Sequence, residues 1–186
     1  MRVLGGRYRG RVLAVPRGLA TRPTGARART ALFDIVGPLL GGAVVADLFA
    51  GTGALGLEAL SRGASRVDFY EDARPALDAL RANIATLGVT DARVVGGSLP
   101  GTLREGAPYD VIFMDPPWRK GLELPVATRL IATGRLGPGT LLVVEAAHRD
   151  SWDESAWLRA RLELTDSRAY GDTEMRFFRA HGTTPE

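Results

Sequence analysis

The chain has 186 residues, of which 45% are hydrophobic and 24% charged, a composition typical of one well-buried globular domain. It has no cysteine, which excludes disulfides and thiolate chemistry, and its two histidines make a histidine-built metal centre unfavourable. No apolar stretch has the length of a membrane span, and the arginine-rich N-terminus is unlike a signal peptide. We therefore expect a cytoplasmic monomer without a metal or a membrane partner.

The net charge of +3 is unevenly distributed. Residues 1–30 contain eight arginines and no acid, which leaves about −5 on the rest of the chain. A solvated face is the simpler explanation of such a run on its own. Unpaired arginines repel one another, however, and a polyanion such as RNA would relieve that repulsion. The candidate RNA contacts are Arg7, Arg9, Arg11, Arg22, Arg27 and Arg29, together with Arg119 and Lys120 from a later loop.

The first predicted elements are two short strands around glycine-rich turns in residues 2–16, which form an arginine-rich β-hairpin extension over residues 1–20. A helix follows Pro23, with Thr24 as a candidate cap. Arg27 and Arg29 are expected to lie off its apolar face and to reach solvent or ligand. The expected apolar face consists of Ala28, Ala31, Leu32, Ile35, Val36 and Leu39.

From residue 43 onward, apolar strands alternate with amphipathic helices. Such alternation predicts an α/β fold with a doubly wound, mostly parallel, Rossmann-like sheet, assigned to a domain over residues 21–182. Residues 159–180 lack a helical pattern and predict an antiparallel strand pair around Tyr170-Gly171-Asp172. The five core strands are expected at residues 43–49, 65–71, 92–95, 109–115 and 140–146, and the helices at 53–63, 73–88 and 124–134.

The sequence AGTGALG after the first core strand contains the spacing G-x-G-x-x-G at Gly51, Gly53 and Gly56. Such a loop holds either a dinucleotide or S-adenosylmethionine (SAM) at the carboxyl edge of the sheet. Asp47 would repel a pyrophosphate but suits the ammonium and sulfonium of SAM, so we favour SAM over NAD. Asp47 could instead cap the helix through loop N–H groups. Glu71 could hold ribose hydroxyls in either case.

The strand at 109–115 ends in Asp115-Pro116-Pro117-Trp118. The carboxylate of Asp115 and the carbonyl of Pro116 can accept both N–H groups of an exocyclic base amine, which directs the amine lone pair at a methyl donor. The prolines fix these acceptors, and Trp118 offers a face for an extruded base. The alternative is a strand terminator followed by a core tryptophan. Catalysis would rest mainly on positioning, with either Asp115 or water accepting the amine proton afterwards.

Taken together, RVLGGRYRGRVLAVP, RPTGARARTALF, DLFAGTGALGLEALSRGA, DFYED and DPPW closely resemble the bacterial 16S rRNA guanine-N2 methyltransferases of the RsmD type. The resemblance covers nearly the whole chain and implies methylation of one guanine in 16S rRNA, within the small ribosomal subunit. It also implies that Glu71 holds the SAM ribose with Asp72 beside it, and that Ser98 and Leu99 meet adenine. The methionine end of SAM would lie against Asp47, Phe49, Gly51, Thr52, Gly53 and Ala54.

The chain departs from the family pattern at three positions. Ser98 stands where Asp or Asn is frequent, Thr30 where Glu is frequent, and Trp118 where Tyr or Phe is usual. Among the remaining polar residues, Glu145 is the best further candidate to touch the guanine. The other polar candidates are interpreted as surface groups: His148 in a loop, and Glu58 and Asp34 as solvated helix charges.

Three other functions compete with this interpretation. A DNA adenine-N6 methyltransferase shares the D-P-P-aromatic tetrad, but the chain has no room for a separate target-recognition domain. A non-catalytic RNA-binding protein of ribosome assembly would not need the intact Asp47, Gly51, Gly53 and Asp115. An NAD oxidoreductase is disfavoured because no residue near the open edge of the sheet resembles a hydride-transfer acid or base.

Overall fold

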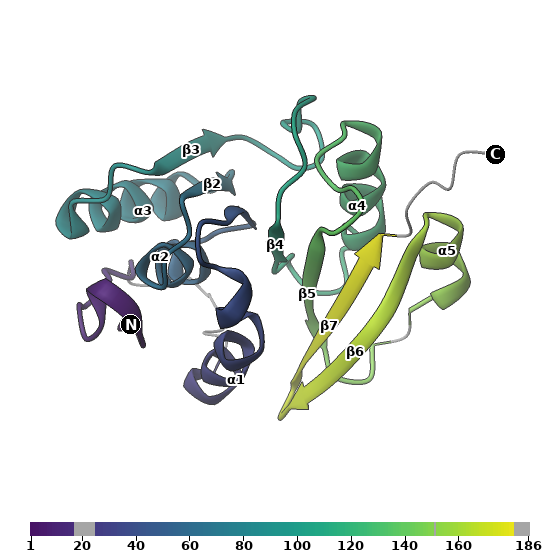
Figure 1. Cartoon of the computed structure of the whole chain (residues 1–186), viewed down its shortest axis with the longest axis horizontal. Coiled ribbons are helices and arrows are strands. Elements are labelled where there is room, and N and C mark those ends of the chain that lie inside the picture. The colour runs from purple at the N-terminus through teal and green to yellow at the C-terminus, as the bar shows by residue number, and fades with distance from the viewer. Residues whose placement is uncertain (17–24, 151, 181–186) are drawn as a thin grey trace.

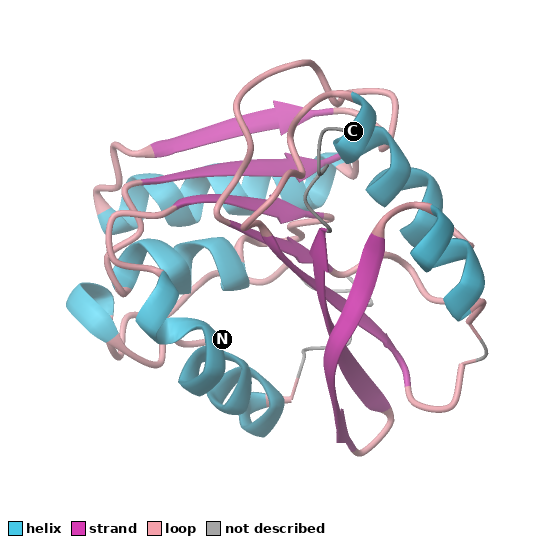
Figure 2. Ribbon diagram, turned by 45° about the vertical axis from the view of Figure 1, so that its right-hand side comes forward, coloured by secondary structure: helices cyan, strands magenta, loops and turns pink. Residues whose placement is uncertain are grey.

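A computed structural model describes residues 1–16, 25–150 and 152–180 of the chain. The candidate RNA contact Arg22 and the candidate cap Thr24 lie outside these residues. The described residues form a seven-stranded sheet in the order β3-β2-β1-β4-β5-β7-β6, with helices on both faces (Figures 1 and 2). This confirms the predicted α/β architecture. Within this part of the chain, no helix combines the length and apolarity needed to cross a bilayer.

The first five strands are parallel and consist largely of apolar residues, as a sheet covered on both faces requires. They are β1 (Val44–Leu48), β2 (Arg66–Glu71), β3 (Ala92–Gly96), β4 (Val111–Met114) and β5 (Leu141–Ala147). The predicted C-terminal hairpin is present as β6 (Leu162–Tyr170) and β7 (Thr173–Ala180). Strand β7 pairs with β5 in the antiparallel direction and so extends the sheet.

The helices cover the sheet in two groups, each of which closes its own core. One core joins α1 (Ala26–Val36), α2 (Ala54–Ser61) and α3 (Arg74–Leu87) to the sheet. The other lies beneath α4 (Glu123–Ala132) and the short α5 (Glu154–Arg159). Helix α3 ends at Gly88, whose φ of 66° is the left-handed conformation that favours glycine after a helix. A 3-10 turn, η2 (Gly37–Leu39), leads from α1 toward β1.

Helix α1 differs from its predicted amphipathic pattern. Its buried face includes Phe33, whereas Ile35 and Leu39 are 38% and 43% exposed. Arg29 was expected to reach solvent or ligand, but it is only 6% exposed and its Nη2 donates to the backbone oxygen of Arg2 at 3.4 Å. The prediction for Arg29 was wrong because the N-terminal segment covers the first turn of α1, a contact that helical periodicity cannot reveal.

The N-terminal segment, residues 1–16, folds back on itself with less regular pairing than two strands. One antiparallel bridge joins Arg2 to Val12, and the 3-10 helix η1 (Gly6–Tyr8) forms the turn between them. Docking on α2 satisfies part of its backbone. In particular, Ser61 Oγ accepts a hydrogen bond from the N–H of Tyr8 at 2.9 Å.

Glu58 is the main anchor of this segment. Its two carboxylate oxygens accept the N–H groups of Leu4 at 2.6 Å and Gly5 at 2.8 Å, and Oε1 also accepts Arg62 Nε at 2.7 Å. The residue is 1% exposed, so its interpretation as a solvated helix charge was wrong. A carboxylate this deeply buried is stable only while it is paired and hydrogen-bonded.

Replacing Glu58 with Ala should lower the free energy of unfolding by about 3 kcal/mol, because it leaves two backbone donors and Arg62 without their acceptor. Urea denaturation measures this change. Hydrogen exchange should quicken at the amides of Leu4 and Gly5. The control is Glu154→Ala on an exposed turn of α5, which should change stability by less than about 0.5 kcal/mol. Unchanged amide protection at Leu4 and Gly5 would contradict the anchoring role.

Candidate active site

Asp47 and Asp115 lie at the carboxyl ends of the two central strands. In the register of β1 and β4, Leu48 is opposite Met114, and the N–H of Asp115 donates to the oxygen of Leu48 at 3.3 Å. Strand β1 has β2 on one side and β4 on the other, so the strand order reverses here. Open α/β sheets bind their ligands at such a switch point.

Asp47 is 2% exposed, and its Oδ2 accepts the N–H of Gly56, in the first turn of α2, at 2.8 Å. Asp47 therefore does accept a hydrogen bond from the first turn of α2, as the alternative of a capping role predicted. Burial raises the pKa of Asp47 to about 8, while the Gly56 hydrogen bond lowers it and the nearby charge of Glu71 raises it further. One hydrogen bond thus offsets only part of the desolvation of this carboxyl group.

Asp115 belongs to the same electrostatic cluster. Burial raises its pKa well above the ordinary value, and the charges of Glu145 and Asp47 raise it further. Glu145, on β5, is itself only 6% exposed. Three carboxyl groups from β1, β4 and β5 therefore share one poorly hydrated region, where a bound cation would be stabilised. Within the described ranges, no group of acids and histidines has the arrangement of a metal site.

The loop between β1 and α2 contains the three glycines of the G-x-G-x-x-G spacing. Gly51 and Gly53 have φ values of 56° and 84°, so both adopt the left-handed conformation. Gly56 has a different role, since a Cβ there would lie 2.3 Å from the ring of Phe69. The first two glycines shape the loop and the third allows α2 to pack closely on β2. Thr52, which is buried, lies between the first two glycines, and half-buried Ala54 begins α2.

Glu71 connects this loop to the end of β2. Its Oε2 accepts the N–H of Gly51 at 2.7 Å, and its Oε1 accepts those of Asp72 at 2.9 Å and Ala73 at 2.8 Å. Farther out, Ser98 Oγ donates to Asp72 Oδ2 at 2.9 Å. The predicted cofactor residues thus lie along one edge of the sheet, on β1 and its loop, on β2 and in the loop after β3. Leu99, next to Ser98, is half-buried.

Backbone strain also gathers at this edge. Three of the four described non-glycine residues with positive φ, namely Phe49, Arg119 and Arg149, lie here with φ values of 59°, 61° and 68°, and the fourth, Arg161, precedes β6. The first three follow β1, β4 and β5, the strands that carry the three carboxyl groups. Such left-handed residues are uncommon and concentrate at functional sites.

Asn83 is a residue of this region that the sequence analysis did not identify. It is 3% exposed on α3, and its Nδ2 donates to the backbone oxygens of Thr52 at 3.0 Å and Ala14 at 3.1 Å. Its Oδ1 accepts the N–H of Ala14 at 2.7 Å. One side chain thus ties the N-terminal segment to the glycine loop. A buried asparagine on an otherwise apolar helix face was the available signal.

The D-P-P-W segment leaves β4 with Pro116 buried, Pro117 exposed, and both Asp115 and Trp118 half-buried. Because Trp118 is half-buried, it does not fit the alternative of a core tryptophan. Arg119 and Lys120 follow in exposed positions, and Arg119 pairs with Asp150 at 4.0 Å. Two surface interpretations are confirmed, since His148 and Asp34 are both exposed.

The basic residues of the N-terminal segment lie elsewhere. Arg7 borders a cavity of about 460 Å³ together with Ser65 and Asp91, which immediately precede β2 and β3. This is the amino edge of the parallel sheet, opposite Asp115. Strands of five residues rising about 3.3 Å each separate the two edges by about 15 Å. Arg9, Arg11 and Arg27 are also exposed, and Arg11 donates to the oxygen of Thr86 at the end of α3.

The strand order, the glycine loop and the acidic carboxyl edge define a Rossmann-like methyltransferase. The chain matches the family described as Conserved hypothetical protein 95 over residues 1–179. It is 41% identical over 147 residues to ribosomal RNA small subunit methyltransferase D of Escherichia coli K12, covering 78% of this chain and 74% of that protein. The chain therefore belongs to the family of ribosomal RNA small subunit methyltransferase D.

Two further relatives agree with this assignment. The Haemophilus influenzae protein of the same name is 35% identical over 150 residues, which is 78% of either chain. A solved structure named "Putative methyltransferase yhhF from Escherichia coli" is 34% identical and superposes with a TM-score of 0.85, covering 98% of this chain and 99% of that chain. The sequence-based prediction of the family is thus confirmed.

The raised pKa of Asp47 should make stability depend on pH. The native state keeps a proton that the unfolded chain releases near pH 4, so the contribution of Asp47 to stability should be fully present below that pH, be lost as pH rises toward 8 and then stay constant. Asp47→Asn removes this titration, so the slope of the unfolding free energy against pH between about 4 and 8 should become smaller. One proton contributes up to about 1.4 kcal/mol per pH unit to that slope. Urea unfolding at several pH values checks this. Equal slopes for both proteins would contradict the buried carboxyl assignment.

Proposed function

We propose that this chain transfers a methyl group from SAM to the exocyclic N2 amine of one guanine in 16S rRNA, within the small ribosomal subunit. The observation that carries the proposal is the convergence of Asp47, Asp115 and Glu145 at the switch point, directly beside the D-P-P-W segment. Ribosomal RNA methyltransferases among the relatives support the same substrate class.

The residues present fit SAM better than a dinucleotide. Asp47 is buried and desolvated, so a nearby positive group would restore its ionised form. A pyrophosphate at the same loop would add negative charge beside Asp47 and Asp115, whose ionisation is already disfavoured by burial and by neighbouring carboxylates. Asp47, Gly51 and Gly53 would hold the methionine end of SAM, Glu71 its ribose, and Ser98 and Leu99 its adenine. When bound, SAM supplies an electrophilic methyl group.

The role of Asp115 follows from its position at the strand end. Its carboxylate and the carbonyl of Pro116 would accept the two N–H groups of the guanine amine and thereby align the nitrogen lone pair. A cation beside Asp47 would lower the pKa of Asp115 and keep it an acceptor. Trp118 would stack on the extruded base. As the new N–C bond forms, the bond from the methyl carbon to the sulfonium would break and leave a neutral thioether; the amine would then lose its proton to Asp115 or to water.

The positions of the basic residues favour a large structured RNA as the substrate. Arg7 lies at the amino edge of the sheet, opposite Asp115, and Arg9 and Arg11 follow it in the same segment, so an RNA that touches these arginines and the reaction site must extend across the α2 and α3 side. Arg27, Arg119 and Lys120 remain candidate phosphate contacts, whereas buried Arg29 does not.

The direct test offers labelled SAM together with small ribosomal subunits, naked 16S rRNA or duplex DNA, all prepared from cells that lack the enzyme. Digestion of the products to nucleosides should give labelled N2-methylguanosine from subunits or rRNA. Labelled N6-methyladenine from DNA would instead establish the DNA methyltransferase. SAM binding without transfer to any of the three would favour a non-catalytic RNA-binding protein.

Asp115→Ala should reduce kcat about 100-fold or more while leaving SAM affinity within about threefold, since it removes an acceptor for the amine and none of the proposed SAM contacts. Turnover assays and calorimetry separate the two effects. Asp34→Ala, an exposed change on α1, should leave both unchanged. Near-normal turnover of the Asp115 variant would remove this residue from the mechanism.

Changing Arg7, Arg9 and Arg11 to Glu should weaken rRNA binding at least about tenfold and flatten its salt dependence, because phosphate contacts release counterions. SAM affinity should not change. The matched control reverses three exposed arginines: Arg129 on α4, Arg161 in the turn between α5 and β6, and Arg168 on β6. If both triple variants lose RNA affinity equally, net charge rather than the N-terminal segment determines binding.

A further inference from the structure

A second cavity, of about 430 Å³, lies between α4, α5 and the paired strands β5 and β7. Arg119 on its wall directly follows Trp118, and Glu123 begins α4. Asp150 on the same wall follows the carboxyl end of β5. The cavity therefore lies at the same edge of the sheet as the proposed methylation site, one strand farther out. Among the described residues, its lining includes neither Asp115 nor Trp118.

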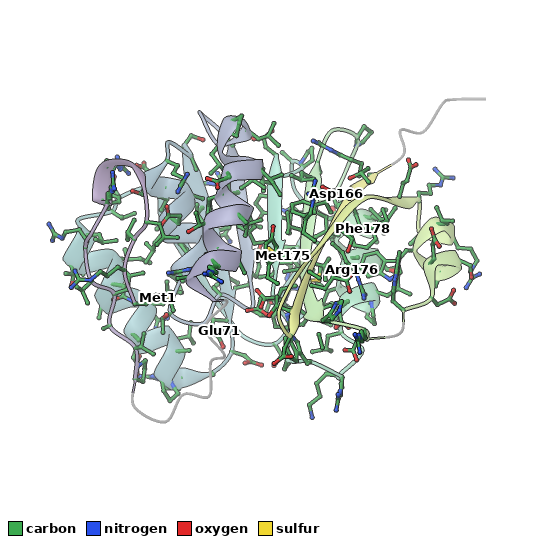
Figure 3. The ribbon with its side chains drawn as sticks, turned by 90° about the horizontal axis from the view of Figure 1, so that it is seen from below. Met1, Glu71, Asp166, Met175, Arg176 and Phe178 are labelled. Carbon is green, nitrogen blue, oxygen red and sulfur yellow. The ribbon has the colours of Figure 1, made fainter. Side chains whose placement is uncertain are left out.

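Arg176 gives this cavity an unused hydrogen-bond donor. The residue is 7% exposed on β7, where Figure 3 shows it near Phe178. Its Nη2 donates to the oxygen of Asp150 at 3.0 Å and to Glu174 Oε2 at 2.9 Å, but its Nε has no partner among the described residues. A buried donor without an acceptor is unfavourable, so Arg176 is a lining residue whose polar groups are only partly satisfied.

The walls of the cavity combine aromatic rings with groups of both charges. The Arg176 guanidinium lies 5.1 Å from the centre of the Trp152 ring, and Trp157 stacks on Phe178. The lining also includes two arginines, Arg119 and Arg176, and three acids, Glu123, Asp150 and Asp153, of which Asp150 lies 4.0 Å from Arg119. A site for phosphate alone would gather cations, and these acids would repel it.

A purine base matches this combination of aromatic rings, arginines and carboxylates better than phosphate does. Its ring can stack on an indole, its ring nitrogens and the O6 of guanine accept from arginine, and its amino group donates to a carboxylate. We propose that this cavity receives a second, unstacked base of the RNA, close in sequence to the methylated guanine. The proposal rests on the proposed function and adds a site that selects the substrate by its base.

The steric test is Leu124→Trp. Leu124 is half-buried on α4 and lines the cavity, so the larger ring should fill it. The KM for small subunits should rise at least about fivefold, the equivalent of one lost base stack, while SAM affinity stays unchanged. The matched control is Ile131→Trp, also half-buried on α4 but outside the cavity lining. Circular dichroism and urea unfolding verify that both variants fold.

The outcomes separate this inference from the proposed function. If the unmodified protein fails to bind SAM or to methylate rRNA, the proposed function is wrong. If it methylates normally and Leu124→Trp raises KM no more than Ile131→Trp does, the second base site is wrong.

A second measurement follows the Arg176 Nε–H resonance by NMR, assigned with Arg176→Lys, while guanosine monophosphate, ribose 5-phosphate or inorganic phosphate is added. A saturable shift with the nucleotide alone supports the base site. An equal shift with all three would indicate an anion site, and no shift with any would overturn the proposal.

Discussion

The gathering of carboxyl groups at the ends of β1, β4 and β5 is the constraint on which the site depends. Parallel strands bring Asp47, Asp115 and Glu145 to one edge, where burial removes the water that would stabilise their charges. Such a cluster destabilises the fold near neutral pH unless a cation accompanies it. In the proposed function the sulfonium and ammonium of SAM would supply that charge, so the feature that destabilises the fold would also favour binding of the cofactor.

The N-terminal segment is part of this arrangement although it lies far from the reacting groups. Glu58 holds its start against α2, and Asn83 holds Ala14 and the glycine loop together on α3. An RNA that binds the arginines of this segment would therefore contact residues that are hydrogen-bonded to Asn83, which in turn donates to the backbone oxygen of Thr52. The N-terminal segment and the glycine loop are thus connected by hydrogen bonds through the buried side chain of Asn83.

Apolar runs and glycines predicted the alternating strands and helices of the core, the turn at Gly171 and the position of Asp115 at a strand end. The sequence did not predict contacts between segments that are far apart in the chain. Glu58 looked like a helix surface charge because its partners, the N–H groups of Leu4 and Gly5, are more than 50 residues away. Arg29 was misplaced for the same reason. The amino-edge position of Arg7 depends on docking against Ser61, which no local pattern encodes.

Calorimetry of SAM binding between pH 5 and 7, in buffers with different ionisation enthalpies, tests the central claim most directly. If Asp47 and Asp115 are protonated in the free protein and ionise beside the cofactor, binding releases protons and tightens as pH rises. Asp47→Asn should remove much of that release. Binding without net proton release, or with proton uptake, would contradict the account in which the acidic edge is completed by a cation.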